Sequence, residues 1–275
     1  LEMTDLREAK IAHIALAPLP YYTPILNALA AKVRLHVVYL SDHPFLVGFS
    51  NQWRIAPQFP YSFIGARSLT VPQWELQFQI TVGVARRLDL LNPDIVLVYG
   101  WHPAMIEPVL WASFRKRPVV MWHESSGFSG HLRGRMSNFL RKQFLRRIDA
   151  FVASGRSAAS YLETLSIPSS KVVTSCLPSG VDLQHVMSTE PRQAGIRFLF
   201  VGRLIPRKRP VELIHAFATV RKQIPEASLW VVGSGPLDAE VKAAAASVGS
   251  DVHILGALEG PALSQIYHES DVLIL

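Results

Sequence analysis

The stretch FLFVGRLIPRKRP, residues 198–210, places four cations directly after an apolar run. The run Phe198–Val201 predicts a buried strand, and the glycine after it predicts a turn where the strand ends. In open α/β sheets, ligands bind just outside the carboxyl ends of the strands. Arg203, Lys208 and their basic neighbours therefore stand where an anionic ligand would bind. A charge run is also typical of a solvated turn, so both interpretations stay open at this point.

Short apolar runs alternate with segments of helical period along the whole chain, which is typical of repeated strand–helix units around a parallel sheet. In the N-terminal half, strands are predicted at 10–17, 34–40, 94–100, 118–124, 150–154 and 171–178, and helices at 21–32, 72–91, 102–116, 132–147 and 156–165. In the C-terminal half, strands are predicted at 197–202, 228–233, 252–256 and 271–275, and helices at 210–223, 236–247 and 260–268.

The polar stretch SGVDLQHVMSTEPRQAG (179–195) separates the two blocks and has little periodicity, which is typical of a linker. The sequence therefore predicts an α/β protein of two Rossmann-like, doubly wound domains. The first is expected over 1–182, a hinge over 183–195, and the second over 196–275. Because the last predicted strand, DVLIL, stops at the final residue, the second domain is expected to be incomplete.

The composition is that of a compact protein with an anionic partner. The 275 residues are 49% hydrophobic and 18% charged, which is enough for a large core and favours two domains. The formal charge of +7 points to nucleic acid, a membrane surface or a phosphate-bearing small molecule, and charge alone does not choose among them. The chain lacks any run of about 18 apolar residues that would predict a membrane-spanning helix.

The single cysteine, Cys176, excludes an intramolecular disulfide and a cysteine-cluster metal site. Together with an N-terminus that lacks the apolar core of a secretory signal, it favours the cytoplasm. The apolar run VVTSCLP around Cys176 predicts a buried structural thiol.

Four segments of the C-terminal half carry a resemblance to a known family. They are FVGRLIPRKRPVELIHAF (200–217), LWVVGSGP (229–236), VHILGAL (252–258) and YHESDVLIL (267–275). In this order and spacing they resemble the family 4 retaining glycosyltransferases, whose fold is the two-domain GT-B type. PSGVD (178–182) and VVMWHE (119–124) extend the likeness over nearly the whole chain.

The resemblance implies that Gly202, Arg203 and Lys208 bind the diphosphate of a nucleotide-sugar. A guanidinium fork beside an ammonium suits both the shape and the charge of a diphosphate. Fixed cations there would also stabilise the charge that grows on the leaving nucleoside diphosphate. Arg207 and Arg209 are expected on a solvated rim.

The resemblance also implies a nucleotide cleft shaped by Gly233 and Gly235, with Ala257 and Leu258 contacting the nucleobase through their main chain. Packing of the helix 236–247 would explain the two glycines equally well. An ordinary strand-to-helix turn would likewise explain residues 257 and 258.

His123 ends the predicted strand VVMWH, and the resemblance places this histidine near the sugar and the acceptor. There it would orient hydroxyl groups or assist proton removal as a catalytic residue. The alternative is a structural pair with the adjacent Glu124.

Two departures from the family pattern limit these expectations. The first loop, LAPLPYYTP (16–24), has no glycine, so no phosphate contact is assigned to it. The family's pair of donor-site glutamates, seven residues apart, would follow DVLIL, beyond Leu275. A chain without them is expected to be inactive by itself.

The predicted helix 132–147 is amphipathic and basic. Met136, Phe139, Leu140 and Phe144 recur at helical spacing, and the remaining faces carry Arg133, Arg135, Arg141, Lys142, Arg146 and Arg147. Such a helix could rest on anionic lipid, or it could dock on the first sheet with a solvated basic face.

The sequence therefore predicts a retaining glycosyltransferase that moves a sugar from a UDP- or GDP-linked donor to a saccharide or lipid-linked acceptor. The expected setting is the cytoplasm, with possible peripheral contact at the inner membrane face, and a role in polysaccharide biosynthesis. No metal or cofactor is expected, because the chain lacks a DxD motif, and no nucleic-acid-binding module is recognisable. The alternative is a non-catalytic GT-B remnant that binds nucleotide or docks a partner. A dehydrogenase is disfavoured, because VVGSGPLDAE lacks the pattern G-x-G-x-x-G.

Overall fold

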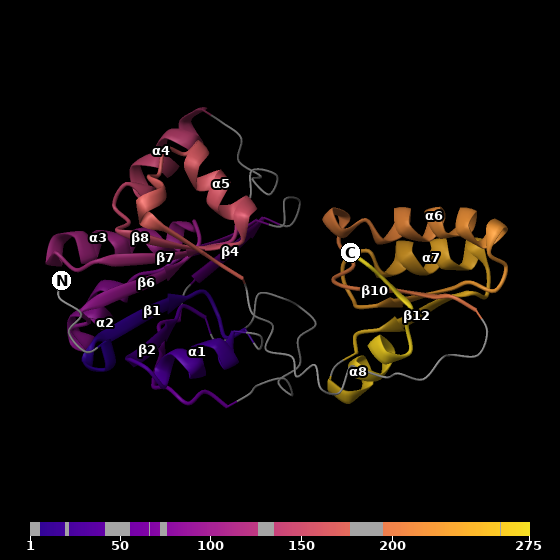
Figure 1. Cartoon of the computed structure of the whole chain (residues 1–275), viewed down its shortest axis with the longest axis horizontal. Coiled ribbons are helices and arrows are strands. Elements are labelled where there is room, and N and C mark those ends of the chain that lie inside the picture. Colours follow the sequence, from indigo (N-terminus) through magenta and orange to yellow (C-terminus); the bar gives the residue numbers. More distant parts are fainter. Residues whose placement is uncertain are drawn as a thin grey trace. The chain divides into compact units, whose positions relative to one another are not determined.

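The computed structural model describes residues 6–19, 22–41, 56–65, 67–71, 76–125, 135–176, 195–258 and 260–275. The described residues up to Cys176 form one compact unit, and those from Gly195 onwards form a second. Each unit is built on a parallel sheet flanked by helices (Figure 1). This confirms the predicted fold class of two Rossmann-like α/β domains. Of the predicted hinge, residues 183–194 lie outside the described residues.

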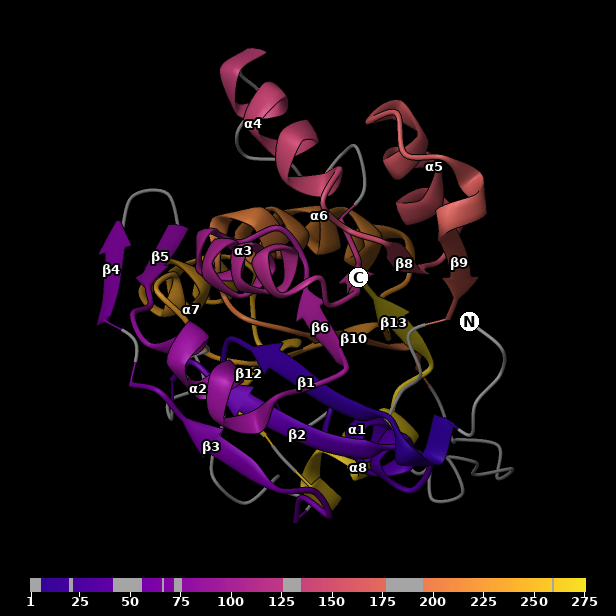
Figure 2. The same ribbon diagram turned by 90° about the vertical axis from the view of Figure 1, so that its left-hand side faces the viewer.

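The first unit has a seven-stranded sheet in the order β3-β2-β1-β6-β7-β8-β9, and every neighbouring pair is parallel. Its strands are β1 (Lys10–Ala15), β2 (Arg34–Tyr39), β3 (Tyr61–Phe63), β6 (Ile95–Tyr99), β7 (Val119–His123), β8 (Ala150–Ser154) and β9 (Val172–Ser175). Figure 2 shows β3, β2, β1 and β6 side by side in this order. The strand order reverses between β1 and β6, which makes that point the topological switch.

Helices cover both faces of this sheet. They are η1 (Leu6–Glu8), α1 (Thr23–Ala30), α2 (Val84–Leu91), η4 (Pro103–Met105), α3 (Ile106–Arg115), α4 (Arg135–Leu145), α5 (Arg156–Thr164) and η5 (Ser169–Lys171). Apolar residues of α2, α3, α4 and α5 share one core cluster with the inward side chains of the strands. A second cluster, around Leu26 of α1 and Phe59, covers the other face. The sheet is therefore doubly wound, as expected for strands that are apolar on both faces.

The helix predicted over 72–91 is wrong in its first part. β4 (Arg67–Val71) and β5 (Leu76–Ile80) form an antiparallel hairpin, and α2 begins only after Gly83, which has φ +106°. In the sequence, Leu76, Phe78 and Ile80 alternate with glutamines. This period of two favours a strand, and it prevailed over the helical spacing of the surrounding apolar residues.

The second unit has a four-stranded parallel sheet in the order β12-β11-β10-β13. Its elements are β10 (Arg197–Val201), η7 (Pro206–Lys208), α6 (Pro210–Gln223), β11 (Ser228–Val232), α7 (Asp238–Val248), β12 (Val252–Gly256), α8 (Gly260–His268) and β13 (Val272–Ile274). α6 and α7 lie on one side of the sheet and α8 on the other (Figure 1). The strand order reverses at β10, so the loop after β10 lies at the topological switch of this sheet.

Cys176 is exposed, which contradicts the predicted buried thiol. It follows β9, the last strand of the seven-stranded sheet, and β9 is mostly accessible, with Val173 64% exposed. An edge strand leaves one flank open to solvent, so an apolar run there does not imply burial.

His13 lies in the centre of the first sheet and is 4% exposed. Its Nδ1 is 3.2 Å from the carbonyl oxygen of Leu97. Burial lowers the pKa of His13 to about 4, and the Leu97 carbonyl offsets part of that shift. The folded protein therefore holds His13 neutral under conditions in which an exposed histidine takes up a proton.

We predict that His13 destabilises the fold in acid. Its pKa is about 4 when folded and about 6.5 when unfolded. As the pH falls between these values, the unfolded chain binds the extra proton, and the free energy of unfolding drops by up to about 3 kcal/mol. In His13→Gln the amide keeps a donor for Leu97 but cannot titrate, so urea unfolding at pH 7 and pH 4.5 should show a smaller loss. An equal loss in both proteins would contradict this prediction. His215→Gln, at an exposed position on α6, is the matched control.

Candidate functional site

Three loops meet at the carboxyl edge of the second sheet. They follow β10, β11 and β12, which are hydrogen-bonded neighbours. The amide of Gly202 donates to the carbonyl of Val232 at 3.0 Å, and the amide of Gly233 donates to the carbonyl of Gly256 at 2.7 Å. The first residues of these loops thus extend the parallel ladder beyond the strands.

The loops after β10 and β11 pack backbone against backbone, which requires glycine at two positions. A Cβ on Gly233 would lie 1.8 Å from the carbonyl oxygen of Gly202, and Gly233 has φ +141°. A Cβ on Gly235 would lie 2.4 Å from the carbonyl oxygen of Leu204. Leu204 donates to Ser234 and accepts from Leu237, both at 3.0 Å. These contacts account for both glycines, and any contact with a nucleotide stays a prediction.

The loop after β10, which these contacts fix, carries Arg203. Arg203 is half-buried, and its Nε is buried without a hydrogen-bond partner among the described residues. A single 3-10 turn, η7, then leads to Arg209, whose left-handed backbone (φ +51°) precedes α6. The loop therefore ends at a helix N-terminus, where free amides and the helix dipole favour an anion.

The other cations of this loop are accessible. Arg207, Lys208 and Arg209 are exposed, and neither they nor Arg203 form an ion pair within the described part of the chain. Uncompensated positive charge thus collects at the switch point of the sheet.

Ala257 and Leu258 follow β12 at the same edge, where Ala257 is exposed and Leu258 half-buried. The structure therefore brings seven of the eight predicted site residues to one sheet edge: Gly202, Arg203, Lys208, Gly233, Gly235, Ala257 and Leu258. His123, the eighth, belongs to the first unit.

His123 is the last residue of β7 and is 1% exposed. Its ring stacks on that of Tyr161 with centroids 6.0 Å apart and planes inclined by 16°. Neither ring nitrogen has a hydrogen-bond partner among the described residues. Burial lowers the pKa of His123 to about 4; the positive charge of Arg141 lowers it further, and the Ser125 backbone offsets part of the shift. The ring is neutral at pH 7 and, at this pKa, a weak base.

Glu124 does not pair with His123, contrary to the alternative considered for that histidine. Its two carboxylate oxygens instead accept hydrogen bonds from the hydroxyls of Tyr22 and Tyr99, which lie 2.6 Å from each other. Burial raises the pKa of the Tyr99 hydroxyl well above its usual range, and Tyr22 and Glu124 add to the rise. The loop after β1 is therefore tied through Tyr22 to the end of β7. One feature of the sequence could have indicated this tether: the aromatic pair in LAPLPYYTP.

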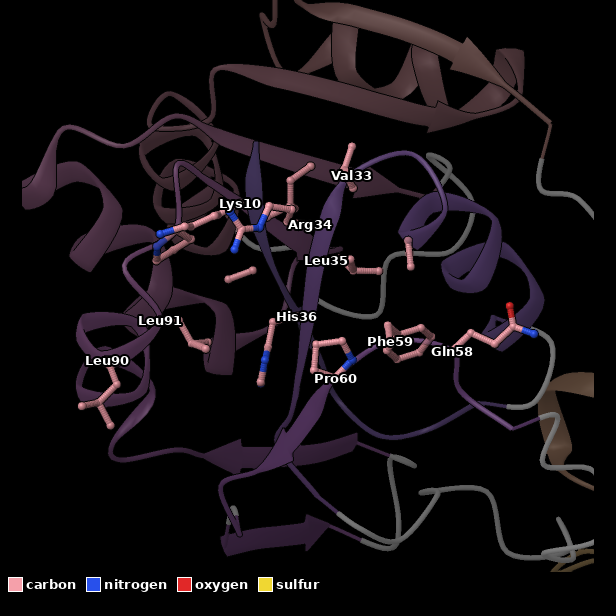
Figure 3. A pocket seen from close by; sticks show the side chains of 14 residues that line it. Lys10, Val33, Arg34, Leu35, His36, Gln58, Phe59, Pro60, Leu90 and Leu91 are labelled. Carbon is pink, nitrogen blue, oxygen red and sulfur yellow. The ribbon is translucent and has the colours of Figure 1, made fainter. Parts of the chain in front are cut away.

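A cavity of about 570 Å³ lies at the edge of the first sheet where β1 and β2 begin, opposite the edge that carries His123 and Glu124 (Figure 3). Lys10 and Arg34, the first residues of β1 and β2, line it together with His36 and Phe59. It contains no predicted site residue.

Within the described ranges, no cluster of three or more His, Cys, Asp or Glu side chains could hold a metal ion. The same ranges contain no helix with the length and apolarity needed to cross a membrane.

Two family models match the chain. The model described as "Glycosyl transferase 4-like domain" matches residues 20–177. The model described as "Glycosyl transferases group 1" matches residues 188–275.

Individual relatives agree with these matches. A GDP-mannose-dependent monoacylated alpha-(1-6)-phosphatidylinositol monomannoside mannosyltransferase of Corynebacterium glutamicum is 33% identical over 95 residues, which is 30% of this chain and only 25% of that protein's length. The structure of Anabaena HepE (Alr3699) in complex with UDP and glucose aligns with a TM-score of 0.69 and 16% identity, over 97% of this chain and 73% of HepE. UDP-GlcNAc 2-epimerase of Neisseria meningitidis, bound to UDP-GlcNAc, aligns with a TM-score of 0.59 and 14% identity, over 96% and 76%. At 16% and 14% identity, these two structures support the assignment of the fold and nothing beyond it.

We predict that Gly233→Ala distorts this site and destabilises the second unit. The added methyl group would overlap the carbonyl of Gly202, and the backbone would be strained at φ +141°. Gly249→Ala is the matched control, since Gly249 has φ +128° but nothing within 4 Å of an added Cβ. The free energy of urea unfolding should fall by about 2 kcal/mol more in Gly233→Ala than in the control. Equal losses would mean that the two loops are not held in contact.

Proposed function

Because the chain belongs to the glycosyl transferase 4-like family, whose model matches more than half of it, we propose that it transfers a sugar from a nucleotide-sugar to a saccharide or lipid-linked acceptor with retention of configuration. The acceptor oxygen forms the new bond to the anomeric carbon, while the bond from that carbon to the diphosphate breaks. The donor is linked to UDP or GDP. HepE and the Neisseria epimerase were solved with UDP or a UDP-sugar, and the Corynebacterium relative is named for GDP-mannose.

The observation that carries this proposal is the group of cations at the switch point of the second sheet, none of which forms an ion pair with a described residue. Arg203 and Lys208 bind the diphosphate beside Gly202, whose lack of a side chain lets the diphosphate approach this loop. A nucleoside diphosphate gains negative charge as the sugar leaves, so cations fixed beforehand lower the barrier without a metal ion. The base lies over Ala257 and Leu258, next to the loop of Gly233 and Gly235.

His123 contacts the sugar or the acceptor from the first unit. Since its ring is neutral and a weak base, it orients hydroxyl groups and does not remove their protons. We take the two domains to extend over 1–182 and 196–275, joined by a linker at 183–195. We place the reaction in the cytoplasm.

The donor site predicts a specific binding result. UDP and GDP, titrated calorimetrically, should bind saturably, with ADP as the comparison nucleotide. Arg203→Ala combined with Lys208→Ala removes two charge-assisted contacts and should weaken binding by about a hundredfold or more. Arg207→Ala, an exposed cation of the same loop, should keep most of the affinity. A folded wild-type chain that binds neither nucleotide, or a double variant with full affinity, would refute the proposed site.

Helix α4 supports the proposed contact with an anionic membrane. Phe144 and Leu145 are buried in the core, so the helix is docked on the sheet. Phe139 and Leu140, however, are 55% and 54% exposed, and Arg146 and Arg147 are exposed at the end of the helix. The predicted single apolar stripe is therefore divided between the core and the surface.

The neighbouring α3 presents a similar surface. Ile106, Leu110 and Phe114 are spaced four residues apart and are 40%, 37% and 86% exposed. Arg115 and Lys116 follow directly and are exposed as well. Exposed apolar side chains bordered by cations are typical of surfaces that rest on anionic lipid.

We predict that Phe139→Ser with Leu140→Ser reduces binding to vesicles of anionic phospholipid by about tenfold, because two exposed apolar side chains no longer enter the lipid. Leu90→Ser, which removes an apolar side chain that is 74% exposed on α2, is the matched control. Cosedimentation at low and high salt measures the effect. Equal binding of both variants, or no binding by the wild type, would argue against membrane contact through α4.

A further inference from the structure

Arg141 of α4 is a buried cation that forms no ion pair among the described residues. The residue is 8% exposed. Its Nη1 donates a hydrogen bond to the hydroxyl oxygen of Tyr161 on α5. Its Nε is buried and has no partner, and within the described residues no carboxylate forms an ion pair with it. Among the described residues, the hydroxyl of Tyr161 is thus the one hydrogen-bond acceptor of this buried guanidinium, and it is neutral.

The sequence around Arg141 offers no counter-charge either. Residues 125–148 contain no aspartate or glutamate. The two carboxylates that border this segment are engaged elsewhere: Glu124 holds Tyr22 and Tyr99, and Asp149 accepts the amide of Val119 at 2.8 Å. A charge that is desolvated and unpaired is strongly unfavourable. A ligand that brings negative charge would remove that cost.

A second observation points to the same place. His123 stacks on Tyr161, the residue that Arg141 contacts. Its two buried ring nitrogens have no partner among the described residues at the distance and angle of a hydrogen bond, although the Ser125 backbone lies close enough to act on the ring. The charge of Arg141 acts on this ring, since it contributes to the lowered pKa of His123. Three side chains, from β7, α4 and α5, therefore meet with unused hydrogen-bonding capacity. Nearby, the buried polar groups of Glu124 and its two tyrosines are fully paired.

We propose that Arg141, Tyr161 and His123 form a binding site for an oxyanion, a phosphate or carboxylate group, in the first unit. The guanidinium supplies the charge and several N–H donors in one plane, which fits two oxygens of such a group. The neutral ring of His123 donates one further N–H. The site itself follows from these contacts, whereas the assignment of the anion to the acceptor rests on the proposed function. The acceptor class is then an anionic one, a phosphate monoester or an acidic saccharide.

Inorganic phosphate is the probe that tests the site. The titration uses the full chain with Arg203→Ala and Lys208→Ala, so that phosphate has no donor site to occupy. With isotope-labelled histidine, the His123 ring resonance, assigned from His123→Gln, should shift saturably at constant ionic strength. Its pKa should rise from about 4, because an anion beside the ring favours the protonated form.

Substitutions on α4 identify the group responsible. Arg141→Gln should weaken phosphate binding by about tenfold or more. Arg146→Gln, the loss of an exposed cation in the turn directly after this helix, should leave phosphate binding unchanged. Arg141→Lys keeps the positive charge and should retain part of the affinity for phosphate. This variant therefore shows whether the loss in Arg141→Gln comes from the missing charge or from a failure to fold. Absence of a saturable shift, or an equal shift in Arg141→Gln, would overturn the proposal.

A second titration distinguishes the two sources of the anion. Glycerol phosphate should bind more tightly than inorganic phosphate if the site takes a phosphate monoester carried by an acceptor. Tighter binding of inorganic phosphate would overturn the assignment to the acceptor. Binding of UDP and GDP by the unsubstituted chain is measured separately. A failure of phosphate to bind at Arg141 can therefore be told apart from a failure of the donor site to bind a nucleotide.

Discussion

The contact on which the second unit depends is the one between two loop backbones, those after β10 and β11. It forms only because Gly233 and Gly235 lack a Cβ, which would otherwise fall 1.8 Å and 2.4 Å from the neighbouring carbonyl oxygens. Through it the loop of Arg203 is fixed at the switch point of the sheet, in front of α6. Cations favour a charged transition state most when they are held in place before the reaction, because no reorganisation is then needed. In the function that we propose, the rigidity of this loop and its charge both serve to bind the diphosphate.

The first unit contains two polar clusters, one around the half-buried Glu124 and one around the buried Arg141 and His123, that differ in how fully they are hydrogen-bonded. Glu124 has both oxygens occupied by Tyr22 and Tyr99, so it fixes the loop after β1 and needs no ligand. Arg141 and His123 lie on the neighbouring elements and keep unpaired nitrogens. A fully paired network stabilises a fold, whereas a partly paired one is costly unless a ligand completes it. This difference separates the structural residues at this sheet edge from the candidate ligand-binding ones.

Much of the fold follows from the sequence, because apolar runs such as FLFVG and LWVVG are short, continuous and bounded by glycine. The hairpin β4–β5 was missed because Leu76, Phe78 and Ile80 fit both a helical and a strand period once their neighbours are counted. Cys176 was misplaced because a sequence does not reveal which strand is at the edge. Arg203 and Lys208 were predicted from ordered motifs, and the structure places them at the sheet edge; their binding role stays a prediction. Arg141 was not singled out, since it is one of six cations on a basic helix and only packing distinguishes it.

The central claim is that a nucleoside diphosphate binds at the carboxyl edge of the second sheet. Backbone amide hydrogen exchange, measured with and without saturating UDP or GDP, tests it most directly. Binding at this edge should slow exchange at residues 202–208 and 233–238 and leave exchange along β1 unchanged. Unchanged exchange in those two segments, in the presence of a nucleotide that demonstrably binds, would contradict it.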